Sequence, residues 1–516
     1  MSSHRILDHQ KRMNSKARVL SMMIVCLLSA QPSAEAMVYQ PTLVPGMGDQ
    51  WLYYHEGVHY LYHLYEQPAG KLHGVYLATS KDGVHFQEVG PVIEKNPSVD
   101  WLGSGTVWKS GGKYMMNFSE SRGHQSISFA ESDDLIHWHR LGEEYTSHPD
   151  PRWYEVGRWD CIWPMPREGG GFWGYLSANP LRRSDAHPEG LTYRSTGMLE
   201  SADGIRWTAI APPVFEWRET PELVNVEIGA VRRFNDKYYM LAQTWGPYPG
   251  GSYLGATGPG VYTFIGDTPK GPFRPDTGAF RFLGNTNART RSTHFARFYE
   301  MPNEVLVNHF LFTRSFKAWL APLKKAVLDD KGHLRLAYWQ GNEAMKGKPG
   351  PVASPFPLSV DGSGGIAVLP LDGQFDVLNG VFLEGALELQ TAGDKPGRCG
   401  IYIEETAEQG TAVLVGTDGK SQLGDLKSKG ATSFEPDDFV EAGITPGREH
   451  MFRLLTRQYM LEFYVNDRLI QCYSIPERAT GRIGFVVQGG RMAVDKLKSW
   501  EMKFPAGIKQ PDPGAK

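Results

Sequence analysis

The sequence predicts an all-β protein: a five-bladed β-propeller followed by a C-terminal β-sandwich. Two short phrases alternate along much of the chain, each typical of a turn that leads into a strand. Glycine (58 residues) and proline (35) are abundant, and aromatic residues make up 12% of the 516 positions. Long Ala/Leu/Glu/Lys runs of the helical kind are nearly absent. This composition favours many short strands joined by turns.

The N-terminus, residues 1–36, has the pattern of an export signal. Five basic residues lead into the apolar run "VLSMMIVCLL" (19–28), and "SAEA" (33–36) ends in the small-x-small pattern of a cleavage site. A membrane span needs about 20 apolar residues, and this run is shorter. We therefore expect a secreted or periplasmic protein without a membrane anchor, although an uncleaved N-terminal anchor remains the alternative. The formal charge of −3 gives no reason to expect a nucleic-acid partner.

The two alternating phrases divide residues 37–345 into five units. The first reads Ser-x-Asp-x-x-x-aromatic, where the Asp suits a tight turn. The second is a Gly/Asn/Asp turn that enters an aromatic, alternating strand, as in a hairpin. The first phrase occurs at 80–86, 132–138 and 201–207, and the second at 56–65, 111–120, 169–178, 235–244 and, more faintly, 301–310. Five repeating units of this kind predict the blades of a five-bladed propeller, with an irregular β-sandwich as the alternative.

A Pro/Gly-rich break, "KGKPGPVASPFP" (346–357), separates these units from a second strand-rich region. "GVFLEGALELQ" (380–390) and "GRIGFVVQG" (481–489) are strand-like, and "YVNDRLI" (464–470) is a hairpin with Asn-Asp at its turn. Residues 358–505 are therefore predicted to form a second all-β domain, a sandwich.

Three acids occupy one position relative to the hairpins. Counting back from the first aromatic residue of a hairpin strand, Asp49 lies eleven residues before Tyr60, Asp160 twelve before Phe172, and Glu227 eleven before Tyr238. The same offset gives Gly103 and Ser104 in the second unit and, counted from Val305 at the start of the fainter fifth hairpin strand, His294 in the fifth. The strand ahead of each hairpin is the innermost strand of a propeller blade. We therefore expect these side chains to converge at one end of the central channel.

Converging carboxylates suit the cleavage of a glycosidic bond. One acid protonates the leaving oxygen, and a second carboxylate acts as nucleophile or base. Apolar walls and neighbouring negative charge raise the pKa of the acid. Trp51 and Trp163 are apolar neighbours of Asp49 and Asp160 in the sequence. Arg158 would hold sugar hydroxyls or keep Asp160 ionised. Each acid also has a structural alternative: a turn residue for Asp49, an ion pair with Arg158 for Asp160, and one with Arg232 or Arg233 for Glu227.

Other residues are weaker candidates for the site. Trp101 is a candidate platform for a sugar ring, with a core position as the alternative, and His294 a candidate lining residue of the channel. Glu120, Glu155 and Glu222 fall off the common offset and are ranked lower. No His/Cys set has the spacing of a metal site, and no cofactor is expected. Cys161, Cys399 and Cys472 remain after signal cleavage, and a Cys399–Cys472 disulfide is left open.

The same motifs resemble glycoside hydrolase family 32, the invertases, inulinases and levanases, over most of the mature chain. "MGDQW" is similar to the opening Asn-Asp-Pro-Asn-Gly motif, which implies Asp49 as nucleophile, and "RWDCIW" to the Arg-Asp-Pro motif, which implies Asp160 as transition-state stabiliser. "VEIG" looks like the Glu-Cys motif, which implies Glu227 as acid/base. "WLGSGTV" resembles a substrate-binding motif and matches Trp101 and Ser104.

The chain departs from the family pattern beside the acids. Gly48 stands where the family has Asn, Gln50 where it has Pro, and Ile228 where it has Cys, while Trp159 intervenes between Arg158 and Asp160. The expected function is a retaining glycosidase that cleaves terminal furanosides of an oligo- or polysaccharide, fructosides first, with Trp51, Trp101, Ser104, Arg158 and His294 binding substrate. The alternatives are an inverting arabinanase-like enzyme, a sugar-binding propeller without catalysis, and, with little direct support, a scaffold protein.

Overall fold

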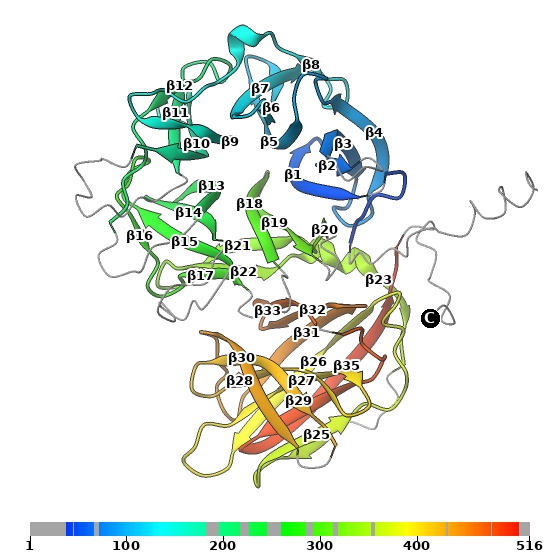
Figure 1. The fold of residues 1–516 in the computed structure, drawn as a ribbon. Helices are drawn as coiled ribbons and strands as arrows, with labels where there is room; N and C mark the ends of the chain where they lie inside the picture. The colour runs from blue at the N-terminus through cyan, green and yellow to red at the C-terminus, as the bar shows by residue number, and fades with distance from the viewer. Residues whose placement is uncertain are drawn as a thin grey trace, which may run out of the picture. The chain divides into compact units, whose positions relative to one another are not determined.

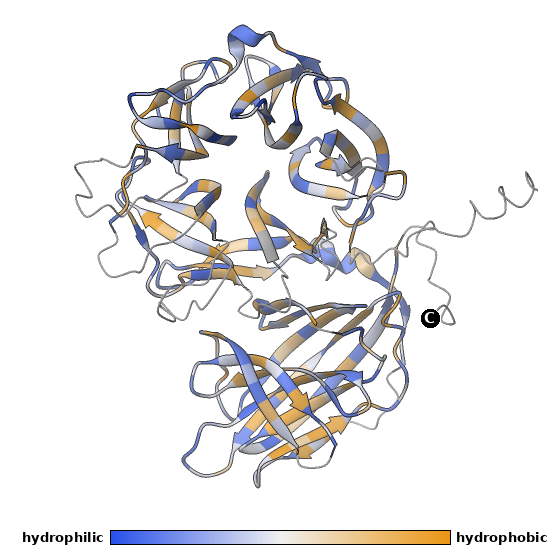
Figure 2. Cartoon of the chain, in the orientation of Figure 1, coloured by the Kyte–Doolittle hydropathy of each residue, from blue (hydrophilic) through white to orange (hydrophobic). Residues whose placement is uncertain are grey.

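Nearly all of the regular secondary structure is β-strand, arranged in antiparallel sheets, which confirms the all-β prediction. The structure is a computed structural model. It describes residues 38–44, 46–66, 72–181, 196–216, 226–244, 260–284, 293–312, 318–351, 357–429, 432–475 and 477–504. The predicted signal, residues 1–36, lies outside these ranges. No helix within them is long and apolar enough to cross a membrane. Many strands alternate hydrophobic and hydrophilic residues along their length (Figure 2).

Four successive sheets and the start of a fifth follow one another along the chain. The first is β1 (Met47–His55), β2 (Val58–Glu66), β3 (Leu72–Ser80) and β4 (Gln87–Glu94). The second is β5 (Trp101–Ser110), β6 (Lys113–Ser121), β7 (Gln125–Ser132) and β8 (His139–Arg140), followed by the 3₁₀ turn η1 (Glu143–Tyr145). The third is β9 (Tyr154–Pro166), β10 (Phe172–Pro180), β11 (Gly197–Ser201) and β12 (Thr208–Ile210).

The fourth sheet contains β13 (Val226–Phe234), β14 (Lys237–Thr244), β15 (Gly260–Gly266), β16 (Phe273–Pro275) and β17 (Arg281–Gly284). The fifth begins with β18 (Thr293–Met301), β19 (Glu304–Phe312), β20 (Ala318–Leu320), β21 (Lys324–Leu328) and β22 (Leu334–Tyr338). The first strands of the five sheets contact one another in a closed cycle: β1 with β5, β5 with β9, β9 with β13, β13 with β18, and β18 with β1. Figure 1 shows the sheets around this common centre.

The Ser-x-Asp phrase builds the same turn in the first three sheets. In the first, Ser80 Oγ accepts a hydrogen bond from the amide of Gly83 (2.9 Å), and Asp82 Oδ1 accepts one from that of His85 (2.8 Å). Ser132 and Asp134 repeat these bonds, as do Ser201 and Asp203. The residue after each Asp has positive φ: Gly83 (72°), Leu135 (67°) and Gly204 (68°). The phrase therefore recurs because its side chains hold the chain reversal between the third and fourth strands.

The remaining strands form two sheets that share a core. After the 3₁₀ turn η2 (Gln340–Met345), the larger sheet continues from β22 through β33 (Arg468–Ser474), β32 (Met460–Val465), β31 (Glu449–Arg457), β26 (Val381–Thr391), β35 (Gly490–Met502), β23 (Lys346–Pro349) and β24 (Leu358–Asp361). The smaller has β25 (Ile366–Pro370), β34 (Ile483–Gln488), β27 (Arg398–Thr406), β28 (Gln409–Gly416), β29 (Ser421–Lys427) and β30 (Ser433–Val440). Leu387, Leu454 and Phe463 of one sheet pack in one cluster with Ile401 and Phe485 of the other.

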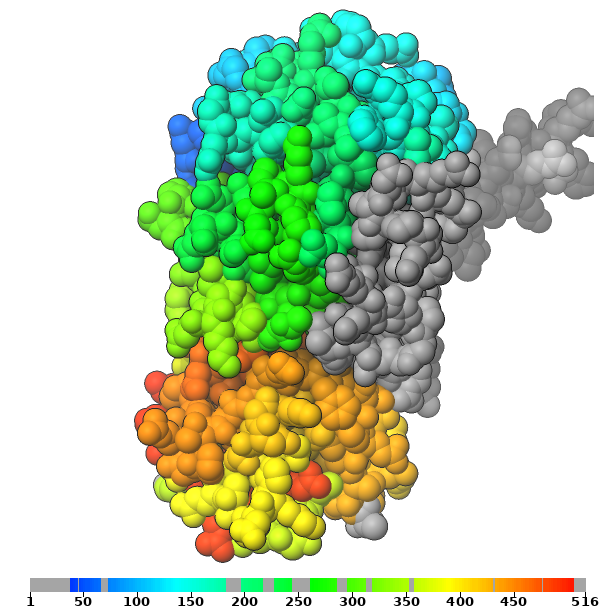
Figure 3. Space-filling view, turned by 90° about the vertical axis from the view of Figure 1, so that its left-hand side faces the viewer, coloured from blue at the N-terminus to red at the C-terminus, as the bar shows by residue number. Residues whose placement is uncertain are grey.

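A buried ion pair and a strand pairing join the fifth sheet to the C-terminal strands. Ala337 of β22 pairs with Arg468 of β33, and the fully buried Lys324 and Glu462 form an ion pair of 2.6 Å. In the space-filling view, residues of the fourth sheet (green) border on residues of the C-terminal sheets (yellow and orange) (Figure 3). Cys399 lies in the smaller sheet and Cys472 in the larger, and both thiols are free, so the disulfide left open by the sequence is absent.

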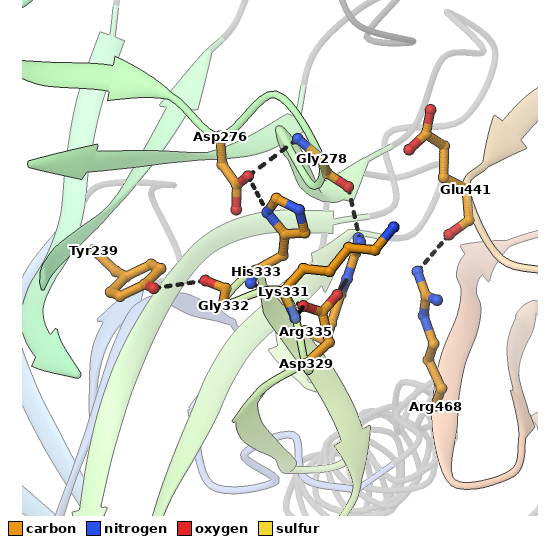
Figure 4. Close-up of polar contacts among 10 residues, drawn as sticks. All are labelled: Tyr239, Asp276, Gly278, Asp329, Lys331, Gly332, His333, Arg335, Glu441 and Arg468. Atoms are coloured by element: carbon orange, nitrogen blue, oxygen red, sulfur yellow. Dashed lines mark hydrogen bonds and ion pairs between the residues drawn. The ribbon is translucent and has the colours of Figure 1, made fainter. Parts of the chain in front are cut away.

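Polar contacts anchor the β21–β22 turn on the fourth sheet (Figure 4). His333 Nδ1 lies 2.5 Å from the buried Asp276 carboxylate, and Tyr239 donates to the Gly332 carbonyl (2.6 Å). Arg335 donates to the Gly278 carbonyl (2.8 Å). The fourth and fifth sheets are thus fixed to each other at the outer edge as well as at the centre.

Acid should destabilise the fold through buried histidines such as His63. This ring is fully buried beside Tyr39, and burial lowers the pKa of His63 to about 4. Above pH 6.5 the ring is neutral in both states, but below it the unfolded chain binds a proton that the folded chain refuses. Urea titrations of the parent and of His63→Gln should therefore show that the cost of the substitution falls by about 2 kcal/mol from pH 7 to pH 5. A cost independent of pH contradicts this, and the exposed His139→Gln provides the control.

Candidate active site

Each of the five central strands carries a β-bulge, and the bulges define the site. A bulge interrupts the pairing of each of these strands with its hairpin partner and re-aims the side chains next to it. The interruptions lie between Met47 and Gln50, Leu102 and Gly105, Asp160 and Trp163, Ile228 and Ala230, and His294 and Arg297. The offsets counted in the sequence fall at these bulges, which is why the same spacing recurs.

Small residues or positive φ allow the chain to pass these bulges. Gly48, Gly103 and Gly229 lie in three of them. In the other two, Cys161 (φ 53°) and Phe295 (φ 48°) adopt the left-handed conformation. A Cβ on Gly229 would lie 2.3 Å from the carbonyl oxygen of Ala296, so only glycine allows β13 and β18 to approach this closely.

The three predicted acids come together from three different sheets. Arg158 on β9 forms an ion pair with Glu227 on β13, and its Nη2 lies 3.7 Å from Asp160 Oδ2. Asp49 on β1 lies within electrostatic range of both Asp160 and Glu227. The side chains of Asp160 and Glu227 keep 19% and 12% of their surface exposed, so solvent reaches the cluster.

Burial and neighbouring charge favour a proton on Asp49. Burial raises the pKa of Asp49 to about 7, and the negative charges of Glu227 and Asp160 add to this, while Arg297 and a hydrogen bond with Ser104 oppose it. Burial also raises the pKa of Asp160, against the effect of Arg158 and of the Ser119 hydroxyl, which donates to it. Asp49 thus retains its proton below about pH 7.

Arg297 is a central residue that the sequence analysis missed. It follows the bulge of β18, is 1% exposed, and donates hydrogen bonds to Ser104 Oγ (3.0 Å), Cys161 Sγ (3.2 Å) and the carbonyl oxygen of Gly105. It thereby ties the second and third sheets to the fifth. The sequence argument looked for carboxylates at the common offset, and the fifth unit has none there. Arg297 lies three residues beyond that position, so counting carboxylates could not identify it.

Hydroxyl and amide side chains of the second sheet brace the strand that carries Asp160. Ser119 Oγ accepts from the amide of Cys161 (3.0 Å), and Asn117 Oδ1 accepts from that of Ile162 (3.1 Å). Asn117 also donates to the carbonyl oxygen of Ile162 (2.8 Å), as does Thr106 (2.6 Å). The bulge between Asp160 and Trp163 thus keeps its backbone groups bonded, although Cys161 leaves the regular strand conformation.

The remaining predicted residues fall in different places. Trp101 packs on Gly103: a Cβ there would lie 2.6 Å from its ring and 3.5 Å from Asp160 Oδ1. Trp51, by contrast, is a core residue, 2% exposed and stacked on Tyr62. The backbone of His294 pairs with Phe310, but its side chain lies outside the described residues.

The three lower-ranked acids lie away from the cluster or outside the described ranges, and Glu227 does not form its expected alternative ion pairs. Glu120 pairs with Arg140 (3.0 Å), Glu155 is exposed, and Glu222 lies outside the described ranges. Glu227 pairs with Arg158 rather than with Arg232 or Arg233, whose partners are Glu300 and Glu168.

One buried cluster has the elements of a metal site. His309, Glu462 and Cys472 have their ligand atoms within 4.8 Å of one another. The Lys324 ammonium, however, lies 2.6 Å from Glu462 Oε1 and supplies the positive charge there. A divalent cation would have to displace this lysine, so the donor set does not fit a resident metal.

Gly105 leaves no room for a side chain. Its Cβ would lie 1.9 Å from the carbonyl oxygen of Asn117, a backbone atom, and 3.2 Å from the Trp51 ring. We expect Gly105→Ala to lower the free energy of unfolding by about 1–3 kcal/mol, the usual cost of overpacking, as measured by urea titration. Gly364→Ala is the control, since a Cβ there meets nothing within 4 Å. Equal stability of both variants would show that the strands are not packed this closely.

Solved structures share this fold at low sequence identity. A β-fructofuranosidase of glycoside hydrolase family 32 from Bombyx mori has a TM-score of 0.64 at 12% identity, covering 96% of this chain and 100% of that one. An exo-inulinase from Aspergillus awamori gives 0.62 at 14% over 92% and 99%, and a fructan 1-exohydrolase from Cichorium intybus 0.61 at 14% over 92% and 98%. No protein-family model and no curated sequence matches. The chain thus has the fold of family 32 glycosidases.

Proposed function

We propose that this protein is a glycoside hydrolase that cleaves terminal β-fructofuranosides with retention of configuration. The observation that carries the proposal is the meeting of Asp49, Asp160 and Glu227, from three sheets, with Arg158 in one partly open cluster. The shared fold with fructosidases and an inulinase supports the substrate class. Under this proposal the five sheets are the blades of a five-bladed propeller, residues 37–345, and residues 358–505 form a sandwich domain.

The reaction would proceed in two steps. In the first, a carboxylate oxygen of Asp49 attacks the anomeric carbon, the bond to the leaving oxygen breaks, and Glu227 gives its proton to that oxygen. In the second, water gives a proton to Glu227 and attacks the same carbon, which releases Asp49. Asp160, held by Ser119 and Arg158, would stabilise the positive charge that develops on the sugar ring.

Arg158 would change partners during this cycle. In the free protein its guanidinium forms an ion pair with the Glu227 carboxylate. Acid catalysis needs the protonated form, so a bound sugar would have to draw Arg158 toward its hydroxyl groups or toward Asp160. Trp101 and Asp160 both lie close to Gly103, and Trp101 would contact the sugar ring. Residues 1–36 would direct export, which makes the protein secreted or periplasmic.

Release of reducing sugar tests this function. We expect turnover of one or more of sucrose, levan and inulin by the parent protein, and a loss of about 10³-fold or more in Glu227→Gln, which removes the acid but keeps its shape. Glu155→Gln, an exposed acid outside the cluster, should keep full activity. Equal turnover by parent and Glu227→Gln would remove Glu227 from the mechanism.

Two other functions remain open to the same assay. An inverting arabinanase-like enzyme would instead release sugar from arabinan, and NMR of the first-formed anomer separates inversion from retention. The Arg158–Glu227 ion pair favours a second candidate, a sugar-binding protein without catalysis, because it occupies the proposed acid. Saturable sugar binding without turnover on any of these substrates would select that candidate.

A further inference from the structure

A small cavity lies where the fifth sheet meets the C-terminal strands. It has a volume of about 50 Å³ and is lined by residues of β17, β22 and β33, with Val440 of β30. None of Asp49, Asp160 and Glu227 lines it, so the cavity is separate from the candidate active site. A single water molecule needs roughly 10–15 Å³ of such volume. The cavity therefore has room for a group of a few non-hydrogen atoms.

The charged residues that line this cavity are three arginines, Arg281, Arg335 and Arg468, and no acid. Two of them are neutralised by carboxylates outside the wall: Arg281 pairs with Asp438, and Arg335 pairs with Asp329 (3.0 Å). Arg468 has no ion-pair partner within the described ranges and donates to the carbonyl oxygen of Glu441. The wall thus offers a positive charge and no negative one.

Arg335 and Arg468 disfavour each other's charge. Figure 4 shows both side chains, which come from β22 and β33, with their guanidinium groups in the same region. Burial and the charge of Arg335 lower the pKa of Arg468 to about 10, although Asp329 and Glu441 act in the opposite direction. Like charges held close together raise the free energy of the folded protein. A negative group between the two guanidinium groups would remove this cost.

Three guanidinium nitrogens of this pair are free to donate. Arg335 uses Nε toward Asp329 and Nη2 toward the Gly278 carbonyl, which leaves Nη1. Arg468 uses Nη2, which leaves Nε and Nη1. In the part of the chain that the structure describes, these three nitrogens have no hydrogen-bond partner. None of them belongs to the buried unpaired atoms, so each keeps accessible surface. A ligand in the cavity can therefore reach them.

We propose that this cavity binds a small free oxyanion, phosphate or sulfate, between Arg335 and Arg468. The ion would accept hydrogen bonds from the free guanidinium nitrogens, a pairing that suits the planar guanidinium group. A free ion fits better than a phosphorylated sugar, because the cavity holds only a few non-hydrogen atoms. Since Arg335 belongs to β22 and Arg468 to β33, the bound ion would fasten the fifth sheet to the C-terminal strands.

Binding of radiolabelled inorganic phosphate to matched variants tests the site. Equilibrium dialysis of the full-length parent at low ionic strength should show one saturable site per chain. Arg468→Gln, which removes the charge, should weaken this binding about tenfold or more, and Arg468→Lys should restore part of it. Arg448→Gln, an exposed arginine outside the cavity, should bind like the parent. No saturable binding to the parent, or equal binding to the parent and Arg468→Gln, overturns the site.

Competition identifies the ligand. Unlabelled sulfate should displace the phosphate, and fructose 6-phosphate should do so at least about tenfold more weakly. Equal displacement by the sugar phosphate would contradict the assignment to a free ion. If Arg468→Gln fails to fold, crystals of the parent grown in phosphate decide: an ion between Arg335 and Arg468 supports the site, and water alone refutes it. None of these measurements involves hydrolysis, so they do not depend on the proposed function.

Discussion

Replacing Asp49 by Asn should abolish turnover while leaving the fold intact. The carboxylate is the proposed nucleophile, and the amide, although it has the same shape, cannot form the glycosyl ester. Single removal of a catalytic nucleophile commonly costs 10⁴–10⁶-fold in kcat, so we expect a loss of about 10⁴-fold or more. The measurement is release of fructose from the best substrate, with Asp133→Asn, an exposed acid outside the site, as the control.

The same substitution should stabilise the protein at neutral and alkaline pH. Burial raises the pKa of Asp49 to about 7 in the folded protein, against about 3.8 for an aspartate in water, so the folded state binds its proton more tightly than the unfolded state. Ionisation therefore costs stability as pH rises from about 4 to about 7, by up to about 4 kcal/mol. The amide removes this cost. Urea titration should show Asp49→Asn more stable than the parent at pH 8, with the difference vanishing near pH 4.

The two effects together separate a catalytic from a structural role. If the carboxylate had a structural role, its replacement would lower the stability and the activity of the protein together. Activity lost with stability gained is the expected signature of a residue kept for chemistry. Substantial residual turnover in Asp49→Asn, beyond what contaminating parent protein explains, would mean that another group attacks the sugar.

Removing the Arg297 charge should have the second largest effect. Its side chain is almost fully buried, and it bonds to Ser104, Gly105 and Cys161 on two other sheets. Arg297→Met would leave these acceptors and Asp49 without their cation. Breaking a buried charged contact costs about 3–5 kcal/mol, and we expect a loss of this size in urea titrations. The exposed Arg152→Met should cost little by comparison.

Arg297 should also set the pH dependence of turnover. The proposed nucleophile must be ionised, so kcat/KM should rise with pH through the pKa of Asp49, about 7. Arg297 lowers this pKa, and its removal should shift the rising limb to higher pH. Arg297→Lys keeps the charge and should keep the limb near its parental position. A profile that falls through pH 7 would instead assign Asp49 as the proton donor.

The common position of the three acids could be predicted from the sequence because the fold consists of repeated units. The central strand of each unit has a bulge at nearly the same number of residues before the hairpin turn. Residues at the same distance in sequence from the hairpin aromatic therefore occupy equivalent positions in their sheets. The Ser-x-Asp phrase was readable for a similar reason, since its side chains close the same turn three times. Both signals come from local geometry that the chain reuses.

Contacts between different sheets could not be predicted from the spacing of residues in the sequence. Arg297 reaches Ser104 across nearly two hundred residues, and Arg158 pairs with Glu227 rather than simply with its neighbour Asp160. Trp51 lies two residues from Asp49, but the bulge at Gly48 and Asp49 sends it into the core. Cys399 and Cys472 lie in different sheets and remain thiols. Such partners depend on how the sheets face one another, which a spacing within one chain segment does not encode.

Trapping the sugar on the protein tests the central claim most directly. Glu227→Gln protein treated with an activated β-fructofuranoside, whose leaving group needs no acid, should accumulate a glycosyl ester. Mass spectrometry should show one added fructosyl residue, on the peptide that contains Asp49. Turnover of this substrate with an inverted product and no adduct, or an adduct on another residue, would contradict the retaining mechanism through Asp49.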